Sequence, residues 1–328
     1  MVMRVFEDYE AKRCAVPLMV GLVGPSGGGK TYSALRLATG IQRVTGGDIF
    51  VIDTESRRSL HYATMFKFRH VPFAAPFGPL DYLAAIEYCV KKGAKVVVVD
   101  SASHEHEGPG GVLEQHAAEV QRLAGDDQAK AERVKMLAWS APKAARRRMI
   151  NSILQMPMSS IFCFRAKEKL KIEAGKEPKK MGFMPIAGEE FIYEMTLNCL
   201  LPPNAGGRPE WHPDEVGEKL MIKLPGQFKQ LFAEPVPLSE DHGETMARWA
   251  EGGAVSVFDD LVRQVADASI ASLDNEIPPK IEEAKKAKSI NPAEYRALRA
   301  AFVNRKKELT GGNGAPPSSP EATESAAT

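Results

Sequence analysis

Residues 24–31 constrain the fold of this chain more than any other part of its sequence. They read GPSGGGKT and match the pattern G-x-x-x-x-G-K-[ST] at every fixed position. A short apolar run, 17–24, precedes them, and apolar residues at helical spacing follow in 30–44. A phosphate-binding loop needs this strand–loop–helix setting, because the loop N–H groups and the helix N-terminus then face the same anion. The pattern predicts such a loop rather than a glycine-rich turn that matches by chance.

Each residue type in this loop suits one part of a nucleoside triphosphate. Glycines let the backbone wrap tightly and turn its N–H groups towards phosphate oxygens. The ammonium group of Lys30 is expected to reach the β- and γ-phosphates, and the hydroxyl of Thr31 is expected to ligate Mg²⁺. The sequence therefore predicts ATP and Mg²⁺ as ligands, held by Gly24, Pro25, Ser26, Gly27, Gly28, Gly29, Lys30 and Thr31.

Short apolar runs alternate with segments of helical periodicity. Strands are expected at 17–24, 48–53, 95–100 and 160–164, and helices at 30–44, 80–92 and 112–123. The run 95–100 reads KVVVVD, and its β-branched valines disfavour a helix. This alternation predicts an α/β fold with a mostly parallel sheet flanked by helices on both faces.

The pattern is less regular after this alternation. A charged helical region is expected from about 128 to 155, with an interruption near Pro142. Two further strands are expected near 191–201 and 219–224. The first part of the chain, 1–250, is predicted to form one P-loop domain.

The composition changes near residue 251. Three short amphipathic helices are expected, at 258–277, 279–289 and 292–309, with Asn291 capping the last one. They are interpreted as a small helical module at 255–310. The remaining segment, 311–328, has too few apolar residues to fold and is predicted to be a disordered tail.

Acidic residues stand at the ends of two predicted strands. Asp100 ends the valine run, and Asp53 and Glu55 end the run before it. Because the carboxyl ends of parallel strands meet beside the phosphate loop, we expect these side chains near the phosphates. Asp100 is predicted to hold the magnesium ion, and Glu55 to polarise the hydrolytic water. For Glu55, a solvated turn carboxylate is the alternative interpretation.

The turns after Asp100 and after the run 160–164 hold further candidates. Residues 101–111 read SASHEHEGPGG, and their histidines could sense the γ-phosphate. A zinc site is not expected there, because the pattern offers no third convincing ligand. Arg165 is expected to act as a catalytic residue that touches the γ-phosphate or relays its presence to the following loop. The alternative is that it only caps the end of its strand.

Basic residues are concentrated between 143 and 180. In a chain of net charge +1 this concentration forms a local patch that attracts anions. We predict a flexible cationic loop that binds DNA, with a solvated loop without a partner as the alternative. The residues assigned to DNA are Lys167, Lys169, Lys171, Lys179 and Lys180. Residues 146–148 either belong to this patch or form an exposed helix face.

The overall composition excludes several classes of protein. Apolar residues make up 44% and charged residues 26% of the 328 residues, which is typical of a soluble globular chain. The cysteines are far apart and form no CxxC pair, so a disulfide framework is not expected. The charged N-terminus and the lack of a long apolar stretch predict a cytoplasmic protein without membrane contact.

Taken together, these motifs resemble those of RecA-like ATPases. Residues 51–63, VIDTESRRSLHYA, resemble the second-strand segment of RecA-type recombinases, which implies that Glu55 activates water. VVVVDSASH resembles their Walker B strand and gives Asp100 the magnesium role. IFCFRAKEK resembles the strand that leads to their second DNA-binding loop, where the family usually has glutamine in place of Arg165. KLMIKLPGQFKQLF is similar to the strand whose lysine reaches a neighbour's ATP, which assigns that role to Lys223.

Within this group, the segments GPSGGGKT, IDTE, DSASHEHEGPGG and IFCFRAKEK resemble phage and prophage AAA/RecA-core ATPases of the single-strand annealing or recombination type. The resemblance covers about residues 18–232. It implies a DNA-dependent ATPase of phage recombination, repair or replication that binds single-stranded DNA. It also implies a homo-oligomeric ring or filament in the host cytoplasm, working with other phage recombination or replication proteins. A small-molecule or nucleotide kinase, and an ATP-switched annealing or loader protein with little turnover, are the alternatives.

Overall fold

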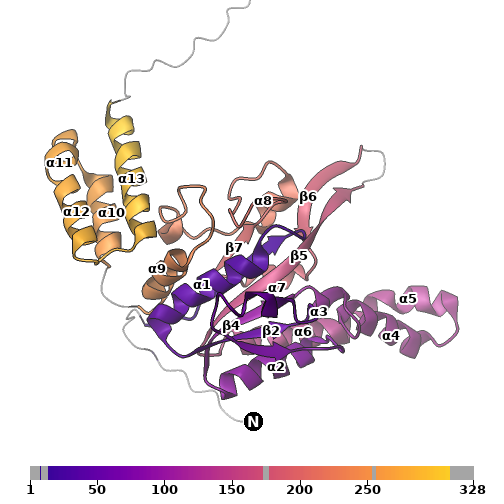
Figure 1. Ribbon diagram of the computed structural model, residues 1–328. Helices are drawn as coiled ribbons and strands as arrows, with labels where there is room; N and C mark the ends of the chain where they lie inside the picture. Colours follow the sequence, from indigo (N-terminus) through magenta and orange to yellow (C-terminus); the bar gives the residue numbers. More distant parts are fainter. Residues whose placement is uncertain (1–7, 9–13, 173–176, 253–255, 311–328) are drawn as a thin grey trace, which may run out of the picture.

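The fold is built around one mostly parallel sheet (Figure 1). The computed structural model describes residue 8 and residues 14–172, 177–252 and 256–310. Within these residues the sheet has seven strands. They are β1 (Met19–Gly24), β2 (Asp48–Asp53), β3 (Arg69–Pro72), β4 (Ala94–Asp100), β5 (Ser159–Lys171), β6 (Lys179–Pro185) and β7 (Leu197–Leu200). Neighbours in the order β3-β2-β4-β5-β1-β7 are all parallel, and only β6 runs antiparallel, beside β5.

This strand order brings the carboxyl ends of β1, β2 and β4 together beside the middle of β5. β5 lies between β1 and β4, and β2 lies beyond β4. The register pairs Gly24 with Arg165, and it pairs Asp100 with Cys163 on one side and with Asp53 on the other. The carboxyl ends of these parallel strands therefore meet at the same end of the sheet, which is where open α/β sheets bind ligands.

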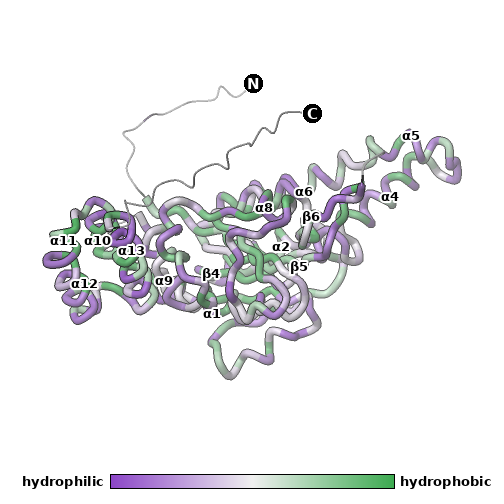
Figure 2. The backbone as a smooth tube through the Cα atoms, turned by 90° about the horizontal axis from the view of Figure 1, so that it is seen from above, coloured by the Kyte–Doolittle hydropathy of each residue, from purple (hydrophilic) through white to green (hydrophobic). Residues whose placement is uncertain are grey.

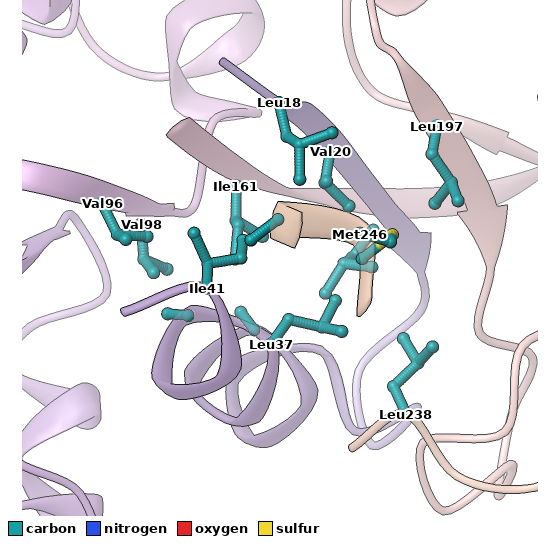
Figure 3. Close-up of a cluster of buried hydrophobic side chains, with 14 of the residues drawn as sticks. Leu18, Val20, Leu37, Ile41, Val96, Val98, Ile161, Leu197, Leu238 and Met246 are labelled. Carbon is teal, nitrogen blue, oxygen red and sulfur yellow. The ribbon is translucent and has the colours of Figure 1, made fainter. Parts of the chain in front are cut away.

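The valine run of β4 is buried on both faces of the sheet. Val96 and Val98 belong to the cluster under α1 (Lys30–Thr45), together with Ile41 (Figure 3). Val97 and Val99 belong to a second cluster on the opposite face. All four valines are fully buried, and each burial contributes roughly 1.5–3 kcal/mol. A strand covered on both faces is apolar at every position, which explains the unbroken run.

Helices cover both faces of the sheet. α1 packs against α9 (Glu240–Ala250) on one face, and α2 (Pro79–Lys91) packs against α6 (Ser140–Ile153) on the other. The other helical elements of this part are α3 (His104–Glu107), α4 (Val112–Ala124), α5 (Gln128–Ala138), α7 (Glu189–Tyr193), α8 (Val216–Met221) and the 3-10 turns η1 (Arg58–Tyr62) and η2 (Gly226–Phe228). The expected α/β architecture is confirmed, although α9 was not predicted.

α1 and α9 approach each other through two glycines. A Cβ added to Gly40 would lie 1.8 Å from the carbonyl oxygen of Glu240, and one added to Gly243 would lie 2.2 Å from that of Leu37. Any larger residue would push the helices apart. Arg36 strengthens the contact through hydrogen bonds of 2.9 Å and 2.6 Å to the carboxylate of Glu240.

Several boundaries predicted from the sequence are wrong. The helical region 128–155 breaks at Trp139 instead of Pro142. Pro142 lies in the first turn of α6. The N–H groups of a first turn have no partner within the helix, so proline, which lacks an N–H, is tolerated there. The strand expected at 160–164 continues to Lys171, so the basic segment is part of β5.

The region before α9 also differs from its prediction. The strand expected near 191–201 is the end of α7 followed by the shorter β7. The first half of the strand expected at 219–224 is the end of α8. Its last part makes only an isolated bridge, between Lys223 and Asn198. Short apolar runs suit either a helix or a strand, and periodicity does not separate them.

The C-terminal helices surround a cluster of their own, which includes Leu273 and Leu298. They are α10 (Val257–Asp267), α11 (Ile270–Asn275), α12 (Ile277–Lys286) and α13 (Pro292–Thr310). The first predicted helix is two helices, because the Ser269 hydroxyl caps a new one. Asn291 caps α13 as predicted, since its Oδ1 accepts hydrogen bonds from two backbone N–H groups of that helix. The tail predicted at 311–328 lies outside the described residues.

Two elements project from the body of the protein (Figures 1 and 2). One is the helical pair α4 and α5, and the other is the ribbon of β5 and β6. The C-terminal helices lie at the opposite end of the molecule from α5 in both views. Among the described helices, none is both long and apolar enough to cross a bilayer.

Candidate functional site

Glycines and the segment after β7 together hold the phosphate loop in shape. Gly27 and Gly29 have φ values of 83° and 90°, a left-handed conformation that glycine adopts without strain. A Cβ on Gly24 or Gly28 would lie 2.3 Å or 2.6 Å from the carbonyl oxygen of Leu201. The loop therefore needs glycine at two positions for backbone conformation and at two more for space.

Lys30 begins α1 directly after this loop. Its Nζ donates hydrogen bonds of 2.8 Å to the carbonyl oxygens of Gly24 and Pro25. Burial lowers the pKa of Lys30, and the nearby carboxylates of Asp100 and Glu55 oppose this shift. The ammonium group is thus folded over the loop and lies close to two acidic strand ends, as the sequence predicts for a cation facing phosphates.

Thr31 and Asp100 connect the loop to β4. The Thr31 hydroxyl donates a hydrogen bond of 2.5 Å to Oδ2 of Asp100. Burial raises the pKa of Asp100 to about 6, although the Thr31 hydroxyl favours the charged carboxylate. A hydroxyl and a carboxylate oxygen side by side are the hard donors that Mg²⁺ prefers. The donor set therefore fits the magnesium ion that the sequence assigned to these two residues.

Glu55 lies inside the site, with its side chain 13% exposed. Arg165 donates to both of its carboxylate oxygens, from Nε to Oε1 at 2.8 Å and from Nη2 to Oε2 at 2.7 Å. Nη1 of Arg58 lies 3.6 Å from Oε2. The geometry favours the interpretation of Glu55 as a site residue over that of a solvated turn carboxylate. It also shows that Arg165 contacts a residue of the site, Glu55, so its role is not limited to capping a strand.

Asp53 anchors the turn that carries Glu55. Its Oδ1 accepts a 2.8 Å hydrogen bond from the backbone N–H of Glu55. Its Oδ2 accepts from the backbone N–H and the hydroxyl of Ser59 and lies 3.3 Å from Nε2 of His70. Burial acts to raise the pKa of Asp53, but the hydrogen bonds outweigh burial and lower it. Asp53 is a charged support for the turn, whereas Asp100 faces the loop.

Hydrogen bonds connect the turn after β4 to the turn after β2 and to the middle of β5. The Ser101 N–H donates to Oγ1 of Thr54 at 2.8 Å, and the Thr54 hydroxyl donates to the Ser101 carbonyl at 3.1 Å. Nδ1 of His104 lies 2.8 Å from the same hydroxyl oxygen. The backbone N–H of Arg165 donates to Oγ of Ser103 at 2.8 Å. These bonds fix the ends of β2 and β4 relative to each other and to Arg165 in the middle of β5. Only their places after acidic strand ends could have pointed to Thr54 and Ser103 in the sequence.

Arg146 does not belong to a basic surface patch. Its side chain is 3% exposed and donates to both oxygens of Glu105, each at 2.9 Å. Nδ1 of His106 lies 2.9 Å from Nη2, and Glu190 accepts a longer bond of 3.3 Å. Burial, with the neighbouring Arg146, lowers the pKa of His106 to about 4. The expectation that residues 146–148 form an exposed face or a DNA contact is therefore wrong for Arg146.

The basic segment after Arg165 is an antiparallel ribbon and not a loop. β5 and β6 pair from Ala166 opposite Pro185 to Lys171 opposite Lys179. Residues 173–176, between the two strands, lie outside the described residues. The prediction of a flexible loop is wrong for the described part of this segment, because backbone pairing between β5 and β6 holds it as two strands.

Alternation places most of these lysines on one face of the ribbon. Side chains two residues apart on a strand share a face, and so do directly paired residues. We call Lys167, Lys169, Lys171 and Lys179 the lysine row; Arg165 is on the same face of β5. Lys180 pairs with Leu170 on the other face, so it is not in the row. Nζ of Lys167 lies 3.9 Å from the carboxylate of Glu107, which places the row on the side of α3.

Lys223 lies outside the site that these residues form. It is exposed, and its Nζ donates a 3.1 Å hydrogen bond to the carbonyl oxygen of Tyr193. The expected strand around it is absent, as described above. Its predicted approach to a neighbour's ATP stays a prediction.

A group of aromatic rings beside the phosphate loop was not predicted. The ring of Tyr32, which follows Thr31, lies 5.9 Å from that of Tyr62 and 5.4 Å from that of Phe66. Tyr32 is 41% exposed. Aromatic faces of this kind are surfaces on which a nucleobase stacks. The sequence signal was a tyrosine next to the loop and the aromatic segment that starts near residue 62.

One end of the sheet thus combines a phosphate loop, a lysine, two oxygen donors for magnesium and a well-held glutamate. These groups suit transfer of a phosphoryl group from a nucleotide to water, a reaction that depends on positioning and on charge stabilisation.

Comparison with known proteins agrees with this geometry. A family model described as an AAA domain matches residues 16–199, more than half of the 328 residues. The matched segment runs from just before β1 into β7 and contains the phosphate loop, Glu55, Asp100 and Arg165. No curated protein matches the chain.

Proposed function

The chain belongs to the AAA domain family of P-loop ATPases, and on that premise we propose that it hydrolyses Mg-ATP with stimulation by single-stranded DNA. The convergence of Lys30, Thr31, Asp100 and Glu55 at the carboxyl end of the sheet carries this proposal. DNA recombination, repair or replication is the process in which such an activity would serve.

Each residue would have a separate task in hydrolysis. Lys30 and the loop N–H groups would hold the phosphates, and Thr31 and Asp100 would hold the metal. A bound magnesium ion supplies positive charge that stabilises the phosphate oxygens during transfer. Glu55 would orient the attacking water and accept its proton, while the γ-phosphoryl group passes to the water oxygen and ADP leaves. The rings of Tyr32 and Tyr62 offer a stacking surface for the base.

The lysine row supports DNA as the stimulating ligand. It is a line of exposed cations on a projecting ribbon, in a chain whose net charge is only +1. Such a line matches a phosphate backbone and releases counterions when it binds one, so affinity depends steeply on salt. The row begins two residues after Arg165, which binds Glu55 in the site.

ATP turnover titrated with single- and double-stranded DNA over a salt series tests the proposal. We expect single-stranded DNA to raise the rate, and the concentration needed for this to increase steeply with salt. Replacing Lys167, Lys169 and Lys171 together with glutamine should abolish the response. The matched control removes the same charge at Lys286 in α12, Lys288 in the turn after it and Lys307 in α13, all of which are exposed, and it should respond as the wild type does.

Two other results would contradict the proposal. Phosphate transfer to a small-molecule acceptor, with no effect of DNA, would indicate a kinase. ATP binding without turnover would indicate a switch protein, such as an annealing or loading factor.

A further inference from the structure

His104 begins α3, beside the turn that carries Glu55. Its Nδ1 lies 2.8 Å from Oγ1 of Thr54, the residue before Glu55. Its ring stacks on that of Phe77, with the centroids 5.1 Å apart and the planes at 29°. The charges of Arg165 and Glu55 both act on the pKa of His104, so the ring lies close to them. The hydrolysis described above uses Glu55 but gives this ordered histidine no task.

The hydrogen bonds of the Thr54 hydroxyl determine which ring nitrogen carries the hydrogen. A hydroxyl has one hydrogen to donate and two lone pairs with which to accept. The Thr54 hydroxyl donates to the carbonyl oxygen of Ser101 at 3.1 Å and accepts from the Ser101 N–H at 2.8 Å. Its remaining lone pair accepts from His104, so Nδ1 carries the hydrogen. In a neutral ring Nε2 then has a lone pair and is an acceptor.

The Nε2 atom of His104 is neutral and open to water. Burial lowers the pKa of His104, and the charge of Arg165 lowers it further, while Glu55 and Glu107 oppose the shift. The residue is half-buried, and in the described part of the chain its Nε2 neither has a hydrogen-bond partner nor is fully buried. An acceptor held in place in this way is available to a bound water. A water in the site therefore has two acceptors nearby, the Glu55 carboxylate and Nε2.

We propose that Nε2 of His104 orients the attacking water by accepting a hydrogen bond from it, while Glu55 accepts its proton. The inference rests on the proposed ATPase and adds one residue to its reaction. Two acceptors, one for each hydrogen, fix the direction in which the water oxygen attacks. That oxygen forms a bond to the γ-phosphorus as the bond from phosphorus to the ADP oxygen breaks. One proton passes to Glu55, and the other hydrogen stays on the released phosphate.

Two substitutions separate this task from a purely structural one, because each copies one ring nitrogen. His104→Asn keeps an N–H near the position of Nδ1, so it retains the bond to Thr54 and loses the acceptor. His104→Gln places an amide oxygen near the position of Nε2 and gives up the bond to Thr54. At saturating Mg-ATP, kcat should be about three- to tenfold lower for His104→Asn, as expected for one neutral hydrogen bond. The KM for ATP should not change, and His104→Gln should be the faster of the two.

His212→Asn is the matched control, because His212 is exposed in the segment after β7. It should hydrolyse ATP at the wild-type rate. The loss for His104→Asn should be the same with and without single-stranded DNA, so the comparison does not depend on stimulation. Nitrogen-15 NMR of the histidine rings in the wild type measures the tautomer without any turnover, and Nδ1 of His104 should carry the hydrogen.

The outcomes separate this inference from the proposed function. If the wild type hydrolyses ATP and His104→Asn does so at the same rate, Nε2 takes no part in the reaction. If His104→Gln is much slower than His104→Asn, the ring only holds Thr54 in place. A hydrogen on Nε2 in the NMR spectrum would also overturn the inference, because the lone pair would be absent. A wild type that hydrolyses no ATP would refute the proposed function together with the inference.

Discussion

Replacing Asp100 with asparagine should make the nucleotide-free protein more stable while it removes a predicted magnesium ligand. Burial raises the pKa of Asp100 from 3.8 to about 6, so the folded protein holds this proton more tightly than the unfolded chain does. A raised carboxyl pKa costs stability as the pH increases. The cost begins near the unfolded pKa and is complete above the folded pKa. Asparagine carries no charge and keeps an oxygen for the Thr31 hydroxyl.

The size of the effect follows from the shift in pKa. A rise from 3.8 to about 6 corresponds to about 3 kcal/mol at pH 7. At pH 5 the folded carboxyl is mostly protonated, and the cost is roughly half as large. Asp100→Asn should raise the free energy of unfolding by these amounts. With a urea m-value of about 3 kcal/mol per M, the unfolding midpoint at pH 7 should increase by about 1 M.

Urea unfolding followed by circular dichroism, without nucleotide or magnesium, measures this effect. Asp53→Asn is the matched control, because it removes a buried aspartate from the adjacent strand end. The pKa of Asp53 is lowered by its hydrogen bonds, so its charge stabilises the fold at neutral pH, and the variant should be less stable there. A gain for Asp100→Asn that is equal at pH 5 and pH 7, or no gain at pH 7, would refute the reasoning.

Three further variants test other parts of the account. Lys30→Ala should weaken ATP binding about 10- to 100-fold, because a charged donor to the phosphates is lost; equilibrium dialysis measures this, and unchanged affinity would contradict the assignment. Arg146→Ala should lower the free energy of unfolding by about 3–5 kcal/mol, since Glu105 is left buried without its partner. Thermal unfolding measures this loss, and a value below about 1 kcal/mol would show that the pair is dispensable. Leu298→Ala should cost about 2–5 kcal/mol in the C-terminal cluster but leave ATP turnover near the wild-type rate, and a large loss of turnover would show that this cluster supports the site.

The parts of the site that the sequence predicted are those fixed by local pattern. The phosphate loop is a contiguous motif, and Asp100 and Glu55 stand directly after apolar runs that only a buried strand explains. Parallel strands then bring their ends together, so the neighbourhood of these side chains followed from the fold class.

What the sequence did not predict depends on contacts between distant segments. Nothing near Arg146 indicates burial, because its partner Glu105 lies on another helix. The pairing of Arg165 with Glu55 likewise requires β5 to lie between β1 and β4, an order that periodicity does not reveal.

The basic ribbon was mistaken for a loop for a different reason. The face of β5 that carries Lys167, Lys169 and Lys171 is exposed, and the other face has Glu168 and the exposed Leu170, so the segment lacks the buried apolar alternation by which a half-buried strand is identified. Its regularity comes from pairing with β6 and not from burial. A search for alternating lysines would have found the lysine row.

The central claim is that Glu55 drives hydrolysis of ATP held by the phosphate loop. Phosphate release from saturating Mg-ATP, measured for the wild type and for Glu55→Gln in parallel, tests it most directly. Phosphate release should be at least about 100-fold slower in the variant, with ATP affinity unchanged. A variant that releases phosphate at the wild-type rate would contradict it.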